Sequence, residues 1–240
     1  MTALAWVEHA LPGGPDERLA LARELDLALE LACRGGDVPD PRGLPVVCVQ
    51  AWDLHREHPL HRDAAARERA REHVQRALQH AERLGAARVL AVCGFGSELV
   101  DAPFERALEF FAGLASEARE RGRRIVLEPL SPGRAAALTD LDEFARLLAA
   151  LPADVFGLAL DTGHLLDGGR DPARVLAAPP APVEELQLRG RSGAPPASDE
   201  AAGWLRTPGL RPRTLVVEHA PGIAAAEVAA LTAALRRSQA

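Results

Sequence analysis

The stretch that decides the fold is RIVLEPLSPG, residues 124–133. It begins with a short apolar run, which is typical of a strand buried on both faces, as strands of parallel sheets are. The run ends in a carboxylate, Glu128, and Pro129 follows at once and cannot continue a ladder of hydrogen bonds. Burying a lone carboxylate is costly unless its charge is paired or binds a metal. The stretch therefore predicts a parallel sheet and a functional reason for a charge at the end of one strand.

Short apolar runs like this one recur along the chain, and amphipathic segments separate most of them. The eight runs are 3–10, 26–32, 45–51, 88–93, 124–129, 156–161, 184–189 and 213–219. The strongest helical spacing covers 62–84, and further helices fit 15–25, 103–121, 139–150, 171–178 and 223–237. Strands that alternate with helices over this length predict an α/β protein with a (β/α)8 TIM barrel.

Two segments depart from the regular alternation. CRGGDVPDPRGL, residues 33–44, is rich in glycine and proline and has no helical period. We therefore expect a barrel that is trimmed around the second crossover. RGRSGAPPASD, residues 189–199, predicts a second long loop. Nothing in the sequence reads as a linker, so residues 1–240 are expected to form a single barrel domain.

Composition excludes several classes of function. The net charge of −6 disfavours non-specific binding to nucleic acid, which needs a positive field. No apolar run approaches the roughly 20 residues of a membrane-spanning helix, and the first residues do not resemble a signal peptide. Cys33, Cys48 and Cys93 are scattered, which fits free thiols in a reducing cytoplasm. The chain has no lysine and no tyrosine, so acid–base chemistry is left to Glu, Asp, His or Cys.

Polar side chains fall at the ends of the last four predicted strands. Period-two alternation places Glu128, Asp161, Gln187 and Glu218 on the inward faces, at the end of the barrel where active sites lie. Three converging carboxylates repel one another without a cation, and oxygen donors suit a divalent ion such as Mn²⁺ or Mg²⁺. The alternative is that each carboxylate caps the following helix or pairs with an arginine.

Other residues at strand ends are candidates for substrate contact. Trp52 follows the third strand, where it would either wall a sugar pocket or belong to the core. Glu30 points inward from the second strand and would bind substrate or pair with an arginine. The remaining candidates are His9 at the end of the first strand and the anion contacts Arg134, Arg189 and Arg191.

Four stretches resemble the signature strands of the xylose isomerase-like barrels: VLEPLSP, LALDTGHLL, ELQLRG and LVVEHA. That superfamily holds sugar isomerases and epimerases, hydroxypyruvate isomerases, inosose dehydratases and endonuclease-IV repair enzymes. The resemblance covers most of the chain, is best over 88–219, and is closest to the hydroxypyruvate isomerase and ketose 3-epimerase branches.

The resemblance also implies roles for single residues. It implies that Glu128, Asp161 and Glu218 bind the metal. Gln187 stands where many members have a histidine ligand, although branches similar to hydroxypyruvate isomerase carry glutamine there. His164 matches a histidine that contacts substrate oxygens.

The activity that this resemblance implies is metal-dependent isomerisation or epimerisation of a small sugar or hydroxy-keto acid. Glu128 and Glu218 would move the carbon-bound proton through a metal-stabilised enediolate. Mn²⁺ or Mg²⁺ is the expected ion, with Co²⁺ and Zn²⁺ as alternatives. The expected partner is the small-molecule substrate, not nucleic acid or membrane, and assembly as a homodimer or homotetramer stays open.

Three other functions remain open at this stage. The barrel could be non-catalytic and act as a binding subunit, because Gln187 is a weaker ligand than histidine. Inosose-type dehydration would use the same enediolate. A zinc-dependent abasic-site endonuclease would need extra histidines, and only the loop with His55, His58 and His61 offers them. That loop is more simply interpreted as a polar segment over the barrel mouth.

Overall fold

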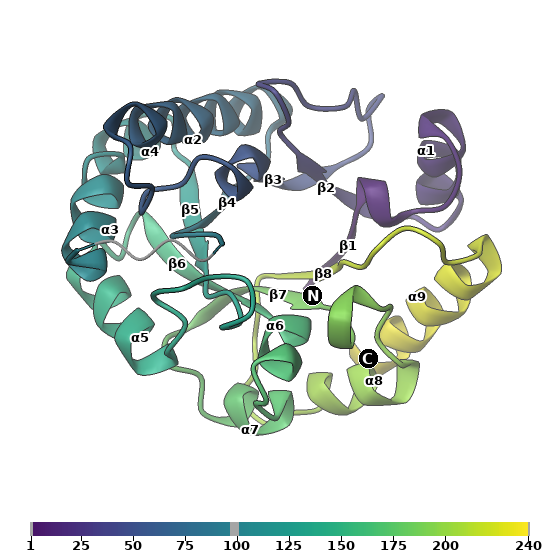
Figure 1. Ribbon diagram of the computed structural model, residues 1–240. Coiled ribbons are helices and arrows are strands. Elements are labelled where there is room, and N and C mark those ends of the chain that lie inside the picture. Colours follow the sequence, from purple (N-terminus) through teal and green to yellow (C-terminus); the bar gives the residue numbers. More distant parts are fainter. Residues whose placement is uncertain (1, 97–100, 240) are drawn as a thin grey trace.

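The computed structural model describes residues 2–96 and 101–239, and its eight parallel strands close into a barrel in chain order (Figure 1). The strands are β1 Ala3–Val7, β2 Ala28–Ala32, β3 Val46–Gln50, β4 Arg88–Val92, β5 Arg124–Glu128, β6 Phe156–Asp161, β7 Val183–Leu188 and β8 Thr214–Val217. Each strand falls within one of the eight apolar runs, apart from the first residue of β7. The predicted (β/α)8 barrel is confirmed.

Helices surround the barrel (Figure 1). They are α1 Pro15–Glu24, α2 Ala64–Leu84, α3 Pro103–Ala112, α4 Ala115–Glu120, α5 Leu141–Ala150, α6 Thr162–Asp167, α7 Pro172–Ala177, α8 Ser198–Leu205 and α9 Ala225–Gln239. Short 3₁₀ helices η1 Glu8–Ala10, η2 Trp52–His55 and η3 Arg191–Gly193 sit in the loops. The longest helix, α2, begins where the Asp63 side chain accepts two backbone N–H groups and ends at Gly85, which has a φ of 70°.

The helices differ from the predicted pattern in three places. The segment 103–121 contains two helices, α3 and α4, because the chain bends at Gly113 and Leu114. Helix α6 was not predicted, because its six residues show no helical period and no proline marks its start, as Pro172 does for the equally short α7. The segment 189–199 is not a loop throughout, because α8 begins at Ser198.

The segment between β2 and β3 is irregular, as predicted. None of residues 33–45 is helical, and all of them are described. A tight turn over 34–37 opens the segment, with backbone hydrogen bonds between Arg34 and Asp37 in both directions. The ring of helices is therefore interrupted here, and this loop runs from the barrel mouth back to the start of β3.

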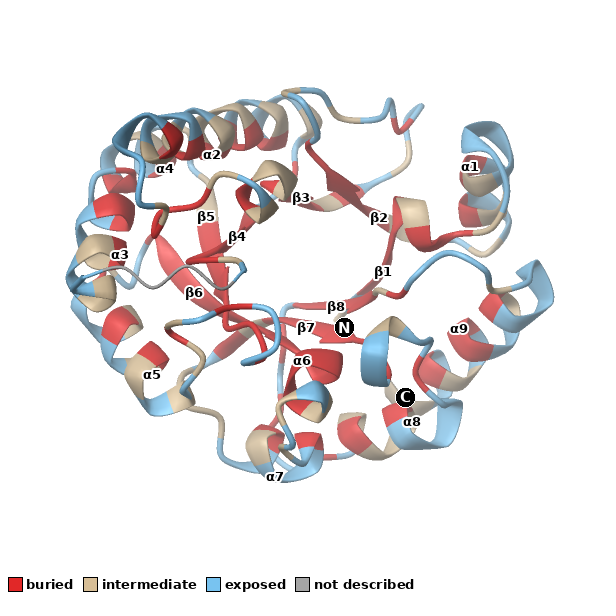
Figure 2. Cartoon of the chain, in the orientation of Figure 1, coloured by how far each residue is buried: buried red, intermediate tan, exposed pale blue. Residues whose placement is uncertain are grey.

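The strands and the inward faces of the helices are buried (Figure 2), and the core consists of an apolar shell and a partly polar barrel interior. Large side chains such as Trp6, Phe111 and Phe144 are fully buried between the strands and the helices. Inside the barrel, small residues leave room for fully buried polar groups, including Glu30 and Glu185. No helix in the described part of the chain is long and apolar enough to cross a membrane.

Candidate active site

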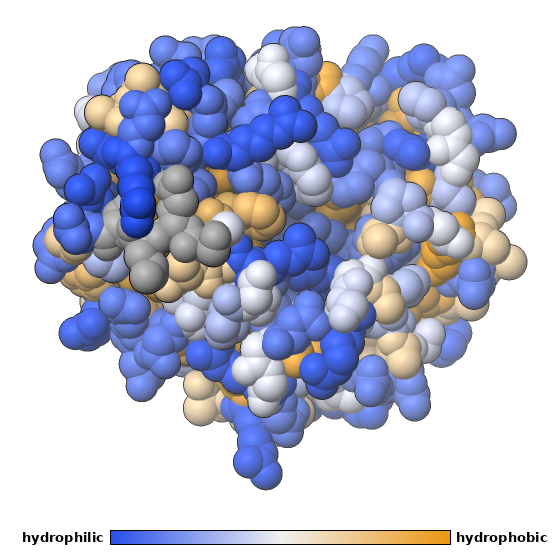
Figure 3. Space-filling model, in the orientation of Figure 1, coloured by the Kyte–Doolittle hydropathy of each residue, from blue (hydrophilic) through white to orange (hydrophobic). Residues whose placement is uncertain are grey.

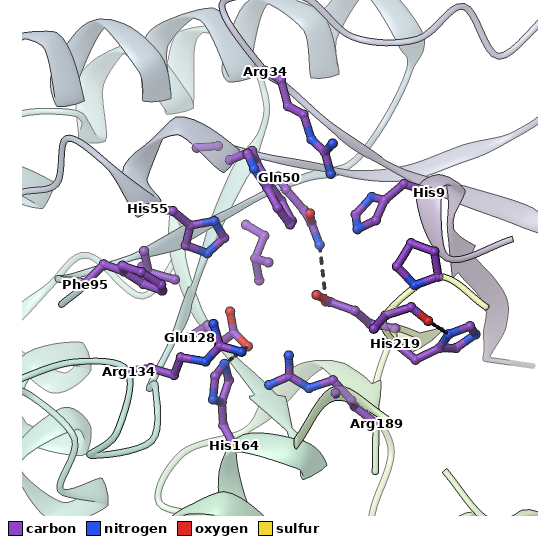
Figure 4. A pocket seen from close by; sticks show the side chains of 18 of the residues that line it. His9, Arg34, Gln50, His55, Phe95, Glu128, Arg134, His164, Arg189 and His219 are labelled. Carbon is purple, nitrogen blue, oxygen red and sulfur yellow. Dashed lines mark hydrogen bonds and ion pairs between the residues drawn. The ribbon is translucent and has the colours of Figure 1, made fainter. Parts of the chain in front are cut away.

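A cavity of about 630 Å³ opens at the carboxyl ends of the strands, and hydrophilic side chains surround its mouth (Figure 3). Its lining comes from segments far apart in the sequence (Figure 4). The predicted residues that line it are His9, Trp52, Glu128, Arg134, His164, Arg189 and Glu218. Asp161 and Gln187 are buried beneath this lining, at the ends of β6 and β7.

An acidic cluster forms where the end of β5 lies beside the junction of β6 and α6. Glu128, Asp161 and His164 each offer a ligand atom, and these atoms lie within 4.8 Å of one another. Asp161 Oδ1 accepts the backbone N–H of His164 at 2.8 Å and so caps α6. The other oxygen, Oδ2, accepts no hydrogen bond and lies 3.2 Å from Nε of Arg189. Asp161 therefore caps α6 with one oxygen and pairs with Arg189 through the other, which has no hydrogen-bond partner among the described residues.

Glu218 follows β8 and enters the cavity from another side. Its Oε2 accepts a hydrogen bond of 3.4 Å from the Gln50 amide (Figure 4). Burial raises the Glu218 pKa to about 7, and the negative charge of Asp161 adds to the increase. Burial likewise raises the Glu128 pKa well above its usual range, helped by Asp161 and Glu218. The Glu218 carboxyl group can therefore hold a proton near neutral pH.

Gln187 is oriented by a hydrogen-bonded network below the cavity. Its Nε2 donates to Oε1 of Glu30 at 2.9 Å, and the Gln50 amide donates to the same oxygen at 2.5 Å. The Gln187 amide oxygen has no hydrogen-bond partner among the described residues. Because Gln187 is paired in register with Asp161, this oxygen belongs to the same end of the barrel as the acidic cluster. Glu30 itself is fully buried and is not among the residues that line the cavity.

The donor set fits a divalent cation. Oxygen atoms of Asp161 and Gln187 are buried without a hydrogen-bond partner, and two more carboxylates line the cavity above them. Such an arrangement is costly unless a positive charge completes it. Carboxylate and amide oxygens are the ligands that Mn²⁺ and Mg²⁺ prefer.

One wall of the cavity is aromatic. The Trp52 ring meets His9 at 5.0 Å and His55 at 4.6 Å, and His55 lies 4.8 Å from Phe95. The Arg34 guanidinium stacks over Trp52 at 4.2 Å. Trp52 therefore lies at the wall of the pocket and not in the core, the two positions that the sequence allowed.

The histidines in the cavity are poor bases. Burial lowers the pKa of His9, His55 and His164 to about 4 in each case. Positive neighbours, Arg34 beside His9 and Arg134 beside His55, add to the decrease. All three rings are therefore neutral at pH 7, so they can hydrogen-bond substrate oxygens without adding charge.

Several lining residues were not predicted from the sequence. Gln50 was a detectable candidate, because it shares the inward face of β3 with Cys48. His55 was treated as part of a polar loop, yet it lines the cavity, whereas His58 and His61 do not. The three histidines form no metal-binding group in the described part of the chain. Arg34 and Phe95 lie in loops that carry no periodic signal.

Comparisons with known proteins agree with this architecture. The family model described as xylose isomerase-like TIM barrel matches residues 15–198. The apo structure of 3-keto-D-glucoside 4-epimerase from E. coli has a TM-score of 0.76 at 13% sequence identity and covers 100% of this chain and 99% of its own. The structure of L-ribulose 3-epimerase has a TM-score of 0.78 at 14% sequence identity and covers 100% of this chain and 96% of its own. The structure of the IolI protein with a bound zinc atom has a TM-score of 0.71 at 13% identity and covers 99% of this chain and 96% of its own. Identities this low show a common fold. No curated protein sequence matches the chain.

Proposed function

This chain belongs to the xylose isomerase-like TIM barrel family, and we propose that it is a metal-dependent isomerase or epimerase of a small sugar or hydroxy-keto acid. The observation that carries the proposal is the pair of cavity carboxyl groups, Glu128 from β5 and Glu218 after β8. Burial raises the pKa of Glu128 well above its usual range and that of Glu218 to about 7. The epimerase names of two similar structures agree with it.

Glu128, Asp161, Gln187 and Glu218 would hold the divalent ion, for which we propose Mn²⁺ or Mg²⁺. When bound, such an ion supplies a Lewis acid that polarises a carbonyl and a neighbouring hydroxyl oxygen of the substrate. The zinc atom in the similar IolI structure supports a divalent ion without identifying it.

The two glutamates would move the proton. A carboxyl group with a pKa near 7 can both accept and return a proton at neutral pH. One glutamate removes the proton from the carbon next to the carbonyl. The other returns a proton to the opposite face, which gives epimerisation, or to the neighbouring carbon, which gives isomerisation. Neutral His164 would donate a hydrogen bond to a substrate oxygen.

Deuterium uptake tests this proposal. The Mg²⁺-loaded protein is incubated in D₂O with a panel of ketoses and hydroxy-keto acids, and products are weighed by mass spectrometry. We expect uptake of one deuterium with at least one substrate. Loss of an acid–base group typically costs about 10²–10⁴-fold, so Glu128→Gln and Glu218→Gln should slow uptake to that extent. The control is Glu200→Gln, an exposed carboxylate in α8.

Three other outcomes would contradict parts of this proposal. Absence of uptake with every member of the panel would contradict the proposed function. Absence of uptake together with absence of metal binding would favour a non-catalytic barrel that acts as a binding subunit. Uptake that is unchanged in both glutamine variants would contradict the roles given to Glu128 and Glu218.

A further inference from the structure

The mouth of the cavity carries positive charge that no described acid balances. Four arginines line the cavity. Two of them have acidic partners, because Arg18 pairs with Glu8 at 3.2 Å and Arg189 pairs with Asp161 at 3.2 Å. Arg34 and Arg134 take part in none of the ion pairs or side-chain hydrogen bonds between described residues, and both are exposed.

A bound metal ion does not compensate these two arginines. Glu128, Asp161 and Glu218 together carry three negative charges when ionised, and a divalent ion with Arg189 balances them. The surplus charge of Arg34 and Arg134 acts on its neighbours: next to burial, Arg34 does most to lower the His9 pKa, and Arg134 does most to lower that of His55. With a divalent ion bound, the positive charges of this site therefore exceed the negative ones by the two arginines, even though the whole chain carries a net charge of −6.

The backbones that carry these arginines are fixed. Arg34 lies in the turn over 34–37, which is held where the Gly35 N–H donates to Oδ2 of Asp53 at 2.7 Å. The Arg34 guanidinium stacks on Trp52. The Arg134 carbonyl accepts the Gly96 N–H at 2.7 Å, and its own N–H donates to Ser131. The guanidinium groups themselves remain free to bind a ligand.

A third arginine also offers an unused donor. Arg189 is only 8% exposed, and its Nη2 is buried without a hydrogen-bond partner among the described residues. Arg34, Arg134 and Arg189 reach the cavity from three different loops (Figure 4). A neutral ketose would leave the charges of Arg34 and Arg134 unmatched, whereas arginine binds carboxylate and phosphate oxygens in bidentate fashion.

We infer that the substrate carries an anionic group, a carboxylate or a phosphate, and that either Arg34 or Arg134, which lie on opposite sides of the cavity (Figure 4), binds it at the mouth. That the bound anion is a substrate rests on the proposed function. The anion site itself is inferred from the arginines. It selects hydroxy-keto acids, sugar acids and ketose phosphates over neutral ketoses.

A binding experiment tests the site without turnover. Inorganic phosphate, glycerate and neutral glycerol are titrated calorimetrically into the full-length protein, both Mg²⁺-loaded and EDTA-treated. We expect at least one anion to bind, more weakly at high salt, while glycerol does not. Arg34→Gln or Arg134→Gln should weaken that binding about tenfold or more, and the variant that does so identifies the arginine that binds the anion. The control is Arg174→Gln, whose side chain is 89% exposed and outside the cavity.

Two results would overturn the site. One is that neither anion binds. The other is that binding is the same in the wild type, the two rim variants and Arg174→Gln, which would place the anion on the metal or elsewhere. Preference for phosphate over glycerate, or the reverse, identifies which anionic group the substrate carries.

A turnover experiment separates this inference from the proposed function. Deuterium uptake is compared for a ketose and its phosphate, and for a hydroxy-keto acid and its neutral ester. We expect kcat/KM to favour the anionic member of a pair, and the preference to fall about tenfold in Arg34→Gln or Arg134→Gln. Faster uptake with the neutral members would overturn the inference and leave the function standing. Anion binding that depends on the arginines, without deuterium uptake from any substrate, would support the anion site and contradict the proposed function.

Discussion

At the scale of single residues, the amide group of Gln187 is the most informative feature of the candidate metal site. A glutamine ligand must present its oxygen and turn its NH₂ away. In this structure Glu30 accepts the Gln187 NH₂ at 2.9 Å, and the amide oxygen has no hydrogen-bond partner among the described residues. Glu30 therefore orients the Gln187 amide, and under the proposed function this glutamine would present its oxygen to the metal.

Glu30→Leu should weaken metal binding without removing a ligand. Loss of a partner that orients a ligand typically costs about 10–100-fold in metal affinity. The measurement is the Mn²⁺ dissociation constant from electron paramagnetic resonance titration, which does not depend on turnover. Gln187→Leu should weaken binding as well, and adding Glu30→Leu to it should cost little more, since the two side chains act as one unit. Fully additive losses would show that Glu30 does not act through Gln187.

At the scale of elements, the contact between α6 and the end of β7 explains the glycine in the DTGH stretch. A Cβ on Gly163 would lie 2.5 Å from Nε of Arg189 and 2.8 Å from the Gly190 carbonyl oxygen. The helix can approach the strand end only because this position has no side chain. The close approach brings together the Asp161 carboxylate, the His164 ring and the Arg189 guanidinium.

Gly163→Ala should therefore damage the site as well as the packing. Overpacking of this kind typically costs about 1–3 kcal/mol of unfolding free energy, measurable by urea denaturation. We also expect weaker metal binding, because Asp161 begins the helix that must move. Gly133→Ala is the matched control, since a Cβ there meets no atom within 4 Å. Equal stability and metal affinity in both variants would contradict this account of the contact.

The elements also show how far sequence patterns reach. The strands are predictable because a doubly buried strand needs a short apolar run, and the inward acids follow from alternation along each strand. Helices α6 and α8 are short, and neither begins with a proline as the short helix α7 does. The contact of Glu30 cannot be predicted because its partner Gln187 lies 157 residues further along the chain. Arg34 is one of many arginines, and only the fold shows that no described acid pairs with it.

At the scale of the whole molecule, the buried acids couple stability to pH. The folded protein holds a proton on Glu218 up to about pH 7, whereas the unfolded chain releases it near the ordinary value of 4.5. The resulting stabilisation is complete below the unfolded pKa and is lost as the pH rises through 7. Neutral buried histidines act in the opposite direction, but only between about 4 and 6.5. Above pH 6.5 the acids alone decide the slope.

The metal-free protein should therefore unfold at lower temperature at pH 8 than at pH 6.5, as measured by circular dichroism after EDTA treatment. Glu218→Gln should flatten this slope. Mn²⁺ should restore stability, and more at pH 8, because the ion binds the deprotonated carboxylates. At 100 times its dissociation constant a ligand contributes about 2.7 kcal/mol, or about 5–10 °C in Tm for a chain of this size. A melting temperature that is the same with and without Mn²⁺ at both pH values would contradict the proposed metal site.

The stacking of Arg34 on Trp52 gives the molecule a built-in optical reporter. The chain has three tryptophans and no tyrosine, so its near-ultraviolet emission comes almost entirely from indole rings. Trp6 and Trp204 are buried in the protein shell, and Trp52 alone lines the cavity, with a cation on its face and two imidazoles at its edges. A molecule that enters the cavity meets this indole directly, whereas Trp6 is reached only through His219, against which it packs. Changes in emission can therefore follow occupancy in real time, without a label and before any substrate has been named.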